Sequence, residues 1–153
     1  MPSDTEHPGP AAASSTSIVL LTLARRIENA LSSELAPLGL TISRLGLLGH
    51  IHGVPGASFS DLARMSGITV QSVHTAVNAL AAAGLVRDST ARAGSASTIE
   101  MTDEGSRLLR AAMTAVARVD EQLFGAEADP IQRQIGDTVR EIFAPQGRDR
   151  PSV

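Results

Sequence analysis

The sequence predicts a mainly α-helical domain that contains one small β-hairpin. Apolar residues recur at intervals of three and four along most of the chain, which is the spacing of one helix face. Aromatic residues make up only 2% of the chain, as three Phe with neither Tyr nor Trp. The core must therefore consist mostly of Ala, Leu, Val and Ile, which favours closely packed helices over aromatic-rich strands. Only residues 86–101 have the pattern of two short strands around a turn.

The chain begins with a segment that predicts a disordered tail, residues 1–16, rich in Pro, Ala and Ser. A long helix follows over residues 17–36, and Pro37 and Gly39 end it. Its apolar stripe consists of Leu20, Ala24, Ile27, Leu31 and Leu35. Thr41 is placed to cap a second helix, whose stripe consists of Ile42, Leu45, Leu48 and Ile51. Residues 53–56 form a loop.

Two short helices come next. Ser58 and Asp61 have the spacing of a capping box and predict a helix over residues 59–65. Ser66 and Gly67 break this helix. Thr69 then caps a second short helix that runs to residue 83, and Gly84 lies where a left-handed C-terminal cap is expected. Residues 86–91 and 97–101 predict two strands around a loop at residues 93–94.

Two longer helices complete the chain. Thr102 caps the first, whose stripe consists of Leu109, Ala112, Val116, Val119 and Leu123. Pro130 opens the last, with Ile131, Ile135, Val139 and Ile142 on one side. Residues 145–153 predict a frayed tail. The apolar stripes near the two chain ends exceed what one small core absorbs, so we expect a homodimer.

The middle of the chain, residues 41–101, has the order of a winged helix-turn-helix: two short helices, a Gly-containing turn between them, and a hairpin. In the second helix one face is apolar, through Val73, Ala76, Val77 and Leu80. The opposite face carries hydrogen-bonding side chains of modest length, as the reading of base edges requires: Gln71, Ser72, His74, Thr75 and Asn78. An ordinary solvated helix face is the alternative, but the hairpin directly after the helix favours DNA recognition.

Three segments resemble the MarR family of transcriptional regulators. They are LGLTISRLGLLGHI at residues 38–51, SFSDLARMSGITVQSVHTAVNALAAAGLV at residues 58–86, and MTDEG at residues 101–105. The resemblance spans roughly residues 20–143. It implies one domain over residues 17–144, in which residues 17–37 and 103–144 form a dimerisation region around the winged helix-turn-helix. It also implies a ligand-responsive repressor that binds a palindromic operator, with the recognition helix in the major groove and the wing tip at the minor groove.

The residues expected to contact double-stranded DNA are Thr69, Gln71, Ser72, His74, Thr75, Asn78, Arg87 and Arg92. Two features depart from the family pattern. The usual Asp-x-Arg signature of the wing is absent, so Arg92 is the candidate wing arginine without an acidic partner. The recognition helix also lacks Arg at the positions of Thr75 and Ala79. Fewer contacts to phosphate weaken binding and flatten its dependence on salt.

The resemblance further implies a small-molecule pocket between the first helix, the second helix and the start of the fifth. Arg26, Arg44 and His50 are the candidates to hold a small organic anion there, because Arg pairs strongly with carboxylates. The alternative is a pocket too small for any ligand, in a protein regulated only by its own concentration.

Composition limits the other function classes. The net charge is −3, and residues 41–101 carry four Arg against three acidic residues, so general nucleic-acid binding is disfavoured. The second function class left open is a protein-interaction or ligand-sequestering module with weak or no DNA binding. No enzyme, metal site or cofactor is expected: there is no Cys and no phosphate-binding loop, and His50 and His52 face different sides of a helix. The first ten residues lack a basic residue, so we expect no signal peptide and a cytoplasmic protein without a membrane segment.

Overall fold

The computed structural model describes residues 15–89 and 98–143, and these residues follow the predicted order of elements. In chain order these are α1 (Thr16–Leu35), the short 3-10 helix η2 (Ala36–Leu38), α2 (Ile42–Gly53), α3 (Phe59–Ser66), α4 (Val70–Ala82), β1 (Val86–Ser89), β2 (Thr98–Met101), α5 (Asp103–Phe124) and α6 (Pro130–Phe143). The predicted tails fall outside the described residues, apart from positions 15 and 16. So do the predicted wing tip and the outer ends of its two strands.

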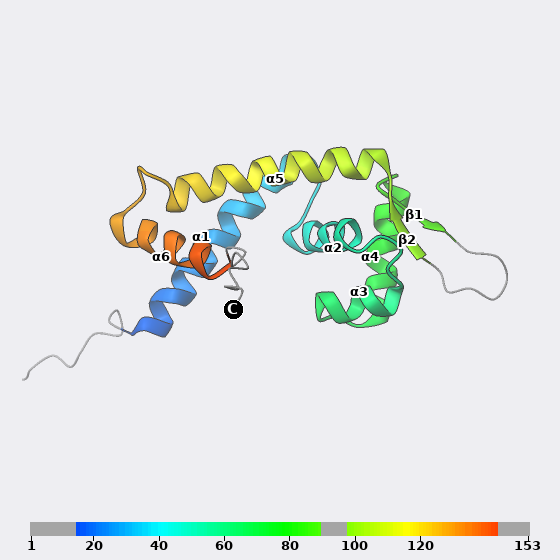
Figure 1. Cartoon of the computed structure of the whole chain (residues 1–153), viewed down its shortest axis with the longest axis horizontal. Coiled ribbons are helices and arrows are strands. Elements are labelled where there is room, and N and C mark those ends of the chain that lie inside the picture. Colours follow the sequence, from blue (N-terminus) through cyan, green and yellow to red (C-terminus); the bar gives the residue numbers. More distant parts are fainter. Residues whose placement is uncertain (1–14, 90–97, 144–153) are drawn as a thin grey trace, which may run out of the picture.

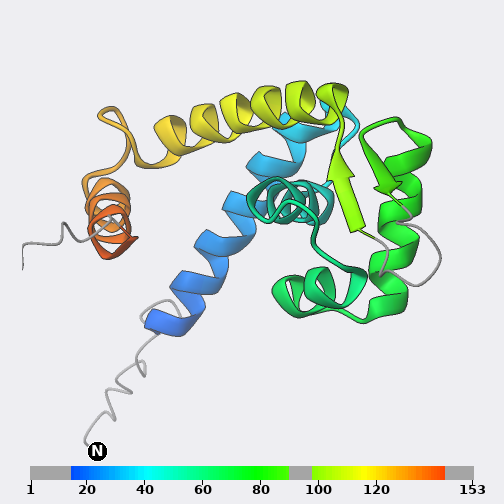
Figure 2. The same ribbon diagram turned by 45° about the vertical axis from the view of Figure 1, so that its right-hand side comes forward.

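The long helix α5 connects two ends of the molecule (Figure 1). Helices α3 and α4 and the hairpin lie at its beginning, and α6 lies beyond its end. Helix α1 packs on α5 and runs obliquely away from it, as the turned view makes clear (Figure 2). The DNA-reading unit expected from the sequence and α6, the last of the expected dimerisation helices, are therefore at opposite ends of α5.

Side-chain caps fix the helix starts where the sequence predicts them. The Thr41 hydroxyl oxygen accepts a hydrogen bond from the backbone N–H of Arg44, at 3.2 Å. Ser58 and Asp61 form the complete capping box, because each side chain accepts from the backbone N–H of the other at 3.1 Å. These bonds satisfy N–H groups that have no partner within the helix.

Several bounds differ slightly from the predictions. Helix α1 begins at Thr16, one residue earlier than expected, and α3 continues through Ser66. After Leu35 the chain tightens into the 3-10 turn before Gly39, whose φ of 67° reverses the chain. Pro37 occupies the first part of that turn, where its missing N–H costs no hydrogen bond.

The core lies between α2, α3, α4 and the hairpin, and the first half of α5 closes it. Its most deeply buried large side chains include Leu48, Leu62, Val73 and Ile99, each completely buried. The predicted α5 stripe is confirmed except at Val116, which is half-buried, whereas Ala115 is fully buried. A step of three from Ala112 to Ala115, followed by four to Val119, keeps the buried positions on one narrow line.

Thr102 joins the hairpin to α5. Its hydroxyl donates a hydrogen bond to the carbonyl oxygen of Gly84 at 2.7 Å and accepts one from the backbone N–H of Gly105 at 3.0 Å. The same side chain therefore caps α5 and holds the end of α4 beside it. Within the described ranges, no helix is both long enough and apolar enough to cross a membrane.

Candidate nucleic-acid interface

The turn between α3 and α4 sets the direction of the second helix. Gly67 adopts a left-handed conformation with φ of 66°, which a residue without Cβ reaches without steric cost. The backbone N–H of Ile68 then donates to the carbonyl oxygen of Ala63 at 3.2 Å, closing the end of α3. Thr69 begins α4 by accepting from the backbone N–H of Ser72 at 3.1 Å. The two helices are therefore fixed by local hydrogen bonds as well as by their shared core.

Helix α4 has the two faces that the sequence predicts. Val73, Val77 and Leu80 are at most 2% exposed, and Ala76 is half-buried. The polar side chains predicted to contact DNA on this helix all lie on the exposed side: Thr69, Gln71, Ser72, His74, Thr75 and Asn78. A helix with this division can enter a major groove while its apolar face stays in the core.

Some of these polar groups already have partners within the protein. The hydroxyl oxygens of Thr69 and Ser72 lie 2.8 Å apart and share a hydrogen bond. The Thr75 hydroxyl donates to the carbonyl oxygen of Gln71 at 3.1 Å, which leaves its oxygen able to accept. The His74 ring stacks on the ring of Phe59 in α3, with centroids 3.7 Å apart and planes inclined by 16°. The sequence did not indicate this stack, because the two residues are on different helices.

The hairpin brings a predicted DNA-contacting arginine opposite a carboxylate. Arg87 on β1 pairs across the strands with Glu100 on β2, and an Nη2–Oε2 distance of 2.9 Å makes this an ion pair. Hydrogen bonds from the Arg87 side chain are the main reason that the pKa of Glu100 lies below its ordinary value. Arg87 is exposed, but much of its positive charge is balanced locally. Arg92 lies outside the described residues.

A second arginine near the recognition helix is also paired. Arg64 of α3 forms an ion pair with Asp61, the carboxylate of the capping box. The pKa of Asp61 is lowered, mainly by the hydrogen bonds from the Ser58 side chain and backbone and further by the charge of Arg64. Asp61 is thereby an ionised group at neutral pH that stabilises the start of α3.

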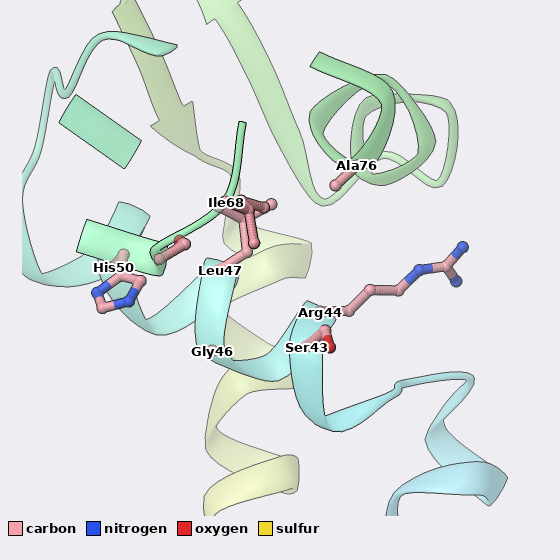
Figure 3. Close-up of a pocket in the computed structure, with 8 residues that line it drawn as sticks. Ser43, Arg44, Gly46, Leu47, His50, Ile68 and Ala76 are labelled. Atoms are coloured by element: carbon pink, nitrogen blue, oxygen red, sulfur yellow. The ribbon is translucent and has the colours of Figure 1, made fainter. Parts of the chain in front are cut away.

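A hollow of about 230 Å³ lies between α2, the end of α3 and α4. Arg44 and His50, both predicted to bind a ligand, line it, but Figure 3 shows their side chains pointing to opposite sides of Leu47 and Ile68. Ser66 also lines this hollow, but its hydroxyl oxygen is buried and has no hydrogen-bond partner among the described residues. The surface of the hollow is largely apolar.

The third predicted ligand residue is elsewhere. Arg26 lines a separate hollow of about 550 Å³ between α1 and α6, so the structure does not bring Arg26 together with Arg44 and His50. The region between α1 and α5 contains a hollow lined by Arg118, which the sequence analysis missed, and by Glu34, its ion-pair partner at 2.9 Å. Within residues 15–89 and 98–143, no cluster of three or more His, Asp or Glu is arranged to hold a metal ion.

Comparison with known proteins places this geometry among transcriptional regulators. A model described as the MarR family matches residues 38–93, which include α2, α3, α4 and β1. The HTH-type transcriptional repressor Rv2887 of Mycobacterium tuberculosis is 31% identical over 104 residues, which cover 67% of this chain and 75% of the repressor.

Solved structures of the same mycobacterial protein, described as a MarR family protein, have a similar fold. One matches with a TM-score of 0.69 at 26% identity and covers 86% of this chain and 96% of that one. A complex of Rv2887 with DNA matches with a TM-score of 0.69 at 24% identity, covering 85% and 98%. A complex with salicylic acid matches with a TM-score of 0.65 at 25% identity, covering 87% and 99%.

Proposed function

The chain belongs to the MarR family, and we propose that it is a transcriptional repressor that binds a specific DNA sequence as a homodimer and responds to a small ligand. The observation that carries the proposal is the exposed polar face of α4, set by the buried Val73 and Val77 and followed directly by a hairpin. The DNA complex of Rv2887 supports the same function for a relative of this chain.

The homodimer is supported by apolar side chains that a single chain leaves in water. On α6, Ile131 is 70% exposed and Ile142 is 65% exposed. On α1, the run from Ile18 to Leu21 is between 49% and 59% exposed. The hollow between these two helices is also lined mostly by apolar residues. A second copy that covers α1 and α6 would remove this surface from water, which is favourable by roughly 25 cal/mol per Å² of apolar area.

We propose that the two recognition helices of the dimer read half-sites about one helical turn, roughly 34 Å, apart, so the operator is an imperfect palindrome. Gln71, His74 and Asn78 are the exposed side chains of α4 proposed to reach base edges, with Thr69, Ser72 and Thr75 near the helix start. Arg87 and Arg92 are proposed to contact the DNA backbone or the minor groove from the wing.

One observation favours the alternative, a protein-interaction or ligand-sequestering module. Arg64 and Arg87 are both paired with carboxylates, so neither presents an uncompensated charge to phosphate in the free protein. Such a module would bind DNA weakly and with little salt dependence.

The proposed ligand is a small organic anion with a single ring, and the salicylic acid complex of Rv2887 supports that class. The hollow beside α4 measures about 230 Å³. Pockets for drug-sized ligands usually measure about 300–1,000 Å³, so this one suits a smaller molecule. Arg44, which lines this hollow, would supply the charge. A ligand there lies against Ala76 and could shift α4 relative to α2.

The decisive experiment is a selection of bound duplexes from a random-sequence library with the full-length protein, at two salt concentrations. We expect an enriched palindrome, and Gln71→Ala should cost about 1–3 kcal/mol and relax one base pair per half-site. Salicylate should then release the selected duplex from the wild type and from Arg26→Ala, but much less from Arg44→Ala. If the selection with the wild type enriches no sequence, the result would instead support the alternative, a protein-interaction or ligand-sequestering module.

A further inference from the structure

His74 is an exposed side chain on the recognition helix, but its ring lies flat on another ring. The ring of Phe59, on α3, is 3.7 Å away between centroids and nearly parallel to it, at 16°. Exposed side chains on a helix usually exchange between rotamers on a fast timescale. A stack on a fixed neighbour restricts that exchange, because leaving the rotamer exposes both ring faces to water.

Phe59 is itself held in place from two directions. It is half-buried and packs against the hydrophobic core. It is also the first residue of α3, directly after Ser58, so the capping box between Ser58 and Asp61 fixes its backbone. The Phe59 ring is therefore a rigid support on which the His74 ring rests.

The stack covers one face of the imidazole ring. It does not cover the edge of the ring, where both nitrogens lie. Those nitrogens can donate or accept hydrogen bonds to base edges or phosphate. A side chain that is already in place when DNA arrives does not lose rotamer freedom on binding. For one side chain this preorganisation corresponds to about a two- to tenfold gain in affinity.

We propose that Phe59 is a positioning residue for DNA recognition: it holds the His74 imidazole at the orientation in which His74 contacts one base pair of each half-site. This inference rests on the proposed function, because it assigns a role within the same DNA-binding surface. Phe59 acts only through His74 and does not itself touch DNA.

The test uses the full-length protein and duplexes selected from a random-sequence library. Base preference and affinity are measured for the wild type, Phe59→Leu, Phe59→Tyr, His74→Ala and the double variant Phe59→Leu with His74→Ala. Phe59→Leu should lose about two- to tenfold in affinity and relax the same base pair as His74→Ala. Phe59→Tyr keeps the aromatic face and should retain the wild-type preference. In the double variant, Phe59→Leu should add little to the loss caused by His74→Ala.

The control for a general structural effect is the base preference due to Gln71, which Phe59→Leu should leave unchanged. The proton NMR signals of the His74 ring should also move downfield in Phe59→Leu, because the ring above them is gone, and not in Phe59→Tyr. Should Phe59→Leu fail to fold, Phe59→Met takes its place, because Met keeps an apolar side chain of similar length without the ring, and it should relax the same base pair as His74→Ala.

Two results would overturn the inference while leaving the proposed function intact. One is a Phe59→Leu protein that binds all sequences more weakly with unchanged preference. The other is additive losses in the double variant. If the wild type enriches no sequence at all, the proposed function fails, and the role of Phe59 fails with it.

Discussion

Gly105 lies so close to Leu85 that no side chain fits between them. A Cβ built on Gly105 would come within 2.1 Å of the Leu85 carbonyl oxygen and 2.6 Å of the Met101 sulfur. The backbone of α5 therefore touches the start of the hairpin directly. This contact gives a physical reason for the glycine in the segment MTDEG, which the sequence analysis identified only by resemblance.

Replacing Gly105 should therefore destabilise the protein. In Gly105→Ala the methyl group forces α5 away from the Leu85 backbone, and such overpacking typically costs about 1–3 kcal/mol. Urea unfolding followed by circular dichroism measures the loss. Gly49→Ala is the matched control, because nothing lies within 4 Å of a Cβ at this position in α2. That change should be neutral or stabilising by up to about 1 kcal/mol. Equal effects of the two substitutions would show that the close contact is unimportant.

Removing the acidic partner of Arg87 should strengthen DNA binding. In Glu100→Gln the Arg87 guanidinium loses its cross-strand ion pair and becomes available to phosphate. Affinity should rise for all sequences alike, and the slope of log K against log salt should steepen by about one unit. Filter binding at several salt concentrations measures both. Glu104→Gln, at the start of α5, removes the same charge beside Arg107 and serves as the control. An unchanged slope in Glu100→Gln would mean that Arg87 stays away from DNA.

The capping box should make the stability of α3 depend on pH. The folded-state pKa of Asp61 lies below its ordinary value of 3.8, because the hydrogen bonds from Ser58 favour the carboxylate. The stabilisation due to Asp61 is therefore fully present above that ordinary value and is lost as pH falls through the folded pKa. Wild type and Asp61→Asn should differ in urea midpoint at neutral pH and converge in acid.

Ser58→Ala checks the other half of the same capping box. It removes the acceptor for the Asp61 backbone N–H and should cost about 1 kcal/mol at neutral pH. The stability of Ser58→Ala should depend less on pH than that of the wild type, because the Asp61 carboxylate no longer accepts a hydrogen bond from the Ser58 hydroxyl. A midpoint difference between wild type and Asp61→Asn that stays constant into acid would contradict the role of the carboxylate.

A charge on the exposed face of α6 should break the proposed dimer. Ile142 is 65% exposed, and a partner copy that buries it could not accept an ionised side chain without loss of affinity. Ile142→Glu should raise the dissociation constant at least about tenfold, which corresponds to about 1.4 kcal/mol. Analytical ultracentrifugation at micromolar concentration measures the change. Val54→Glu, in the loop after α2, also adds a charge at an exposed apolar residue and should leave the dimer intact. A wild type that sediments as a monomer would refute the dimer itself.

The features that the sequence predicted well are local. A cap joins residues three positions apart, so Thr41, Ser58 and Thr69 could be identified from spacing and side-chain type alone. The buried face of α4 follows in the same way from the helical repeat.

The features that escaped prediction join residues far apart in the chain. Arg87 and Glu100 meet only because of the hairpin register, and Phe59 and His74 meet only because of the angle between α3 and α4. The separation of Arg26 from Arg44 depends on how α1 and α2 are placed, which no spacing in the sequence specifies. Helical patterns determine which side of a helix is buried, but they do not determine which neighbour covers it.

Helix α5 is one unbroken helix, so a tilt at one of its ends displaces the other end. Its 22 residues span about 33 Å, from the hairpin junction at Thr102 to the turn before α6. A tilt of only about 5° at one end moves the other end by about 3 Å, which is as long as a hydrogen bond. A rearrangement among the helices at the α6 end, too small to disturb their packing, would thus be enough to carry α4 out of register with a groove.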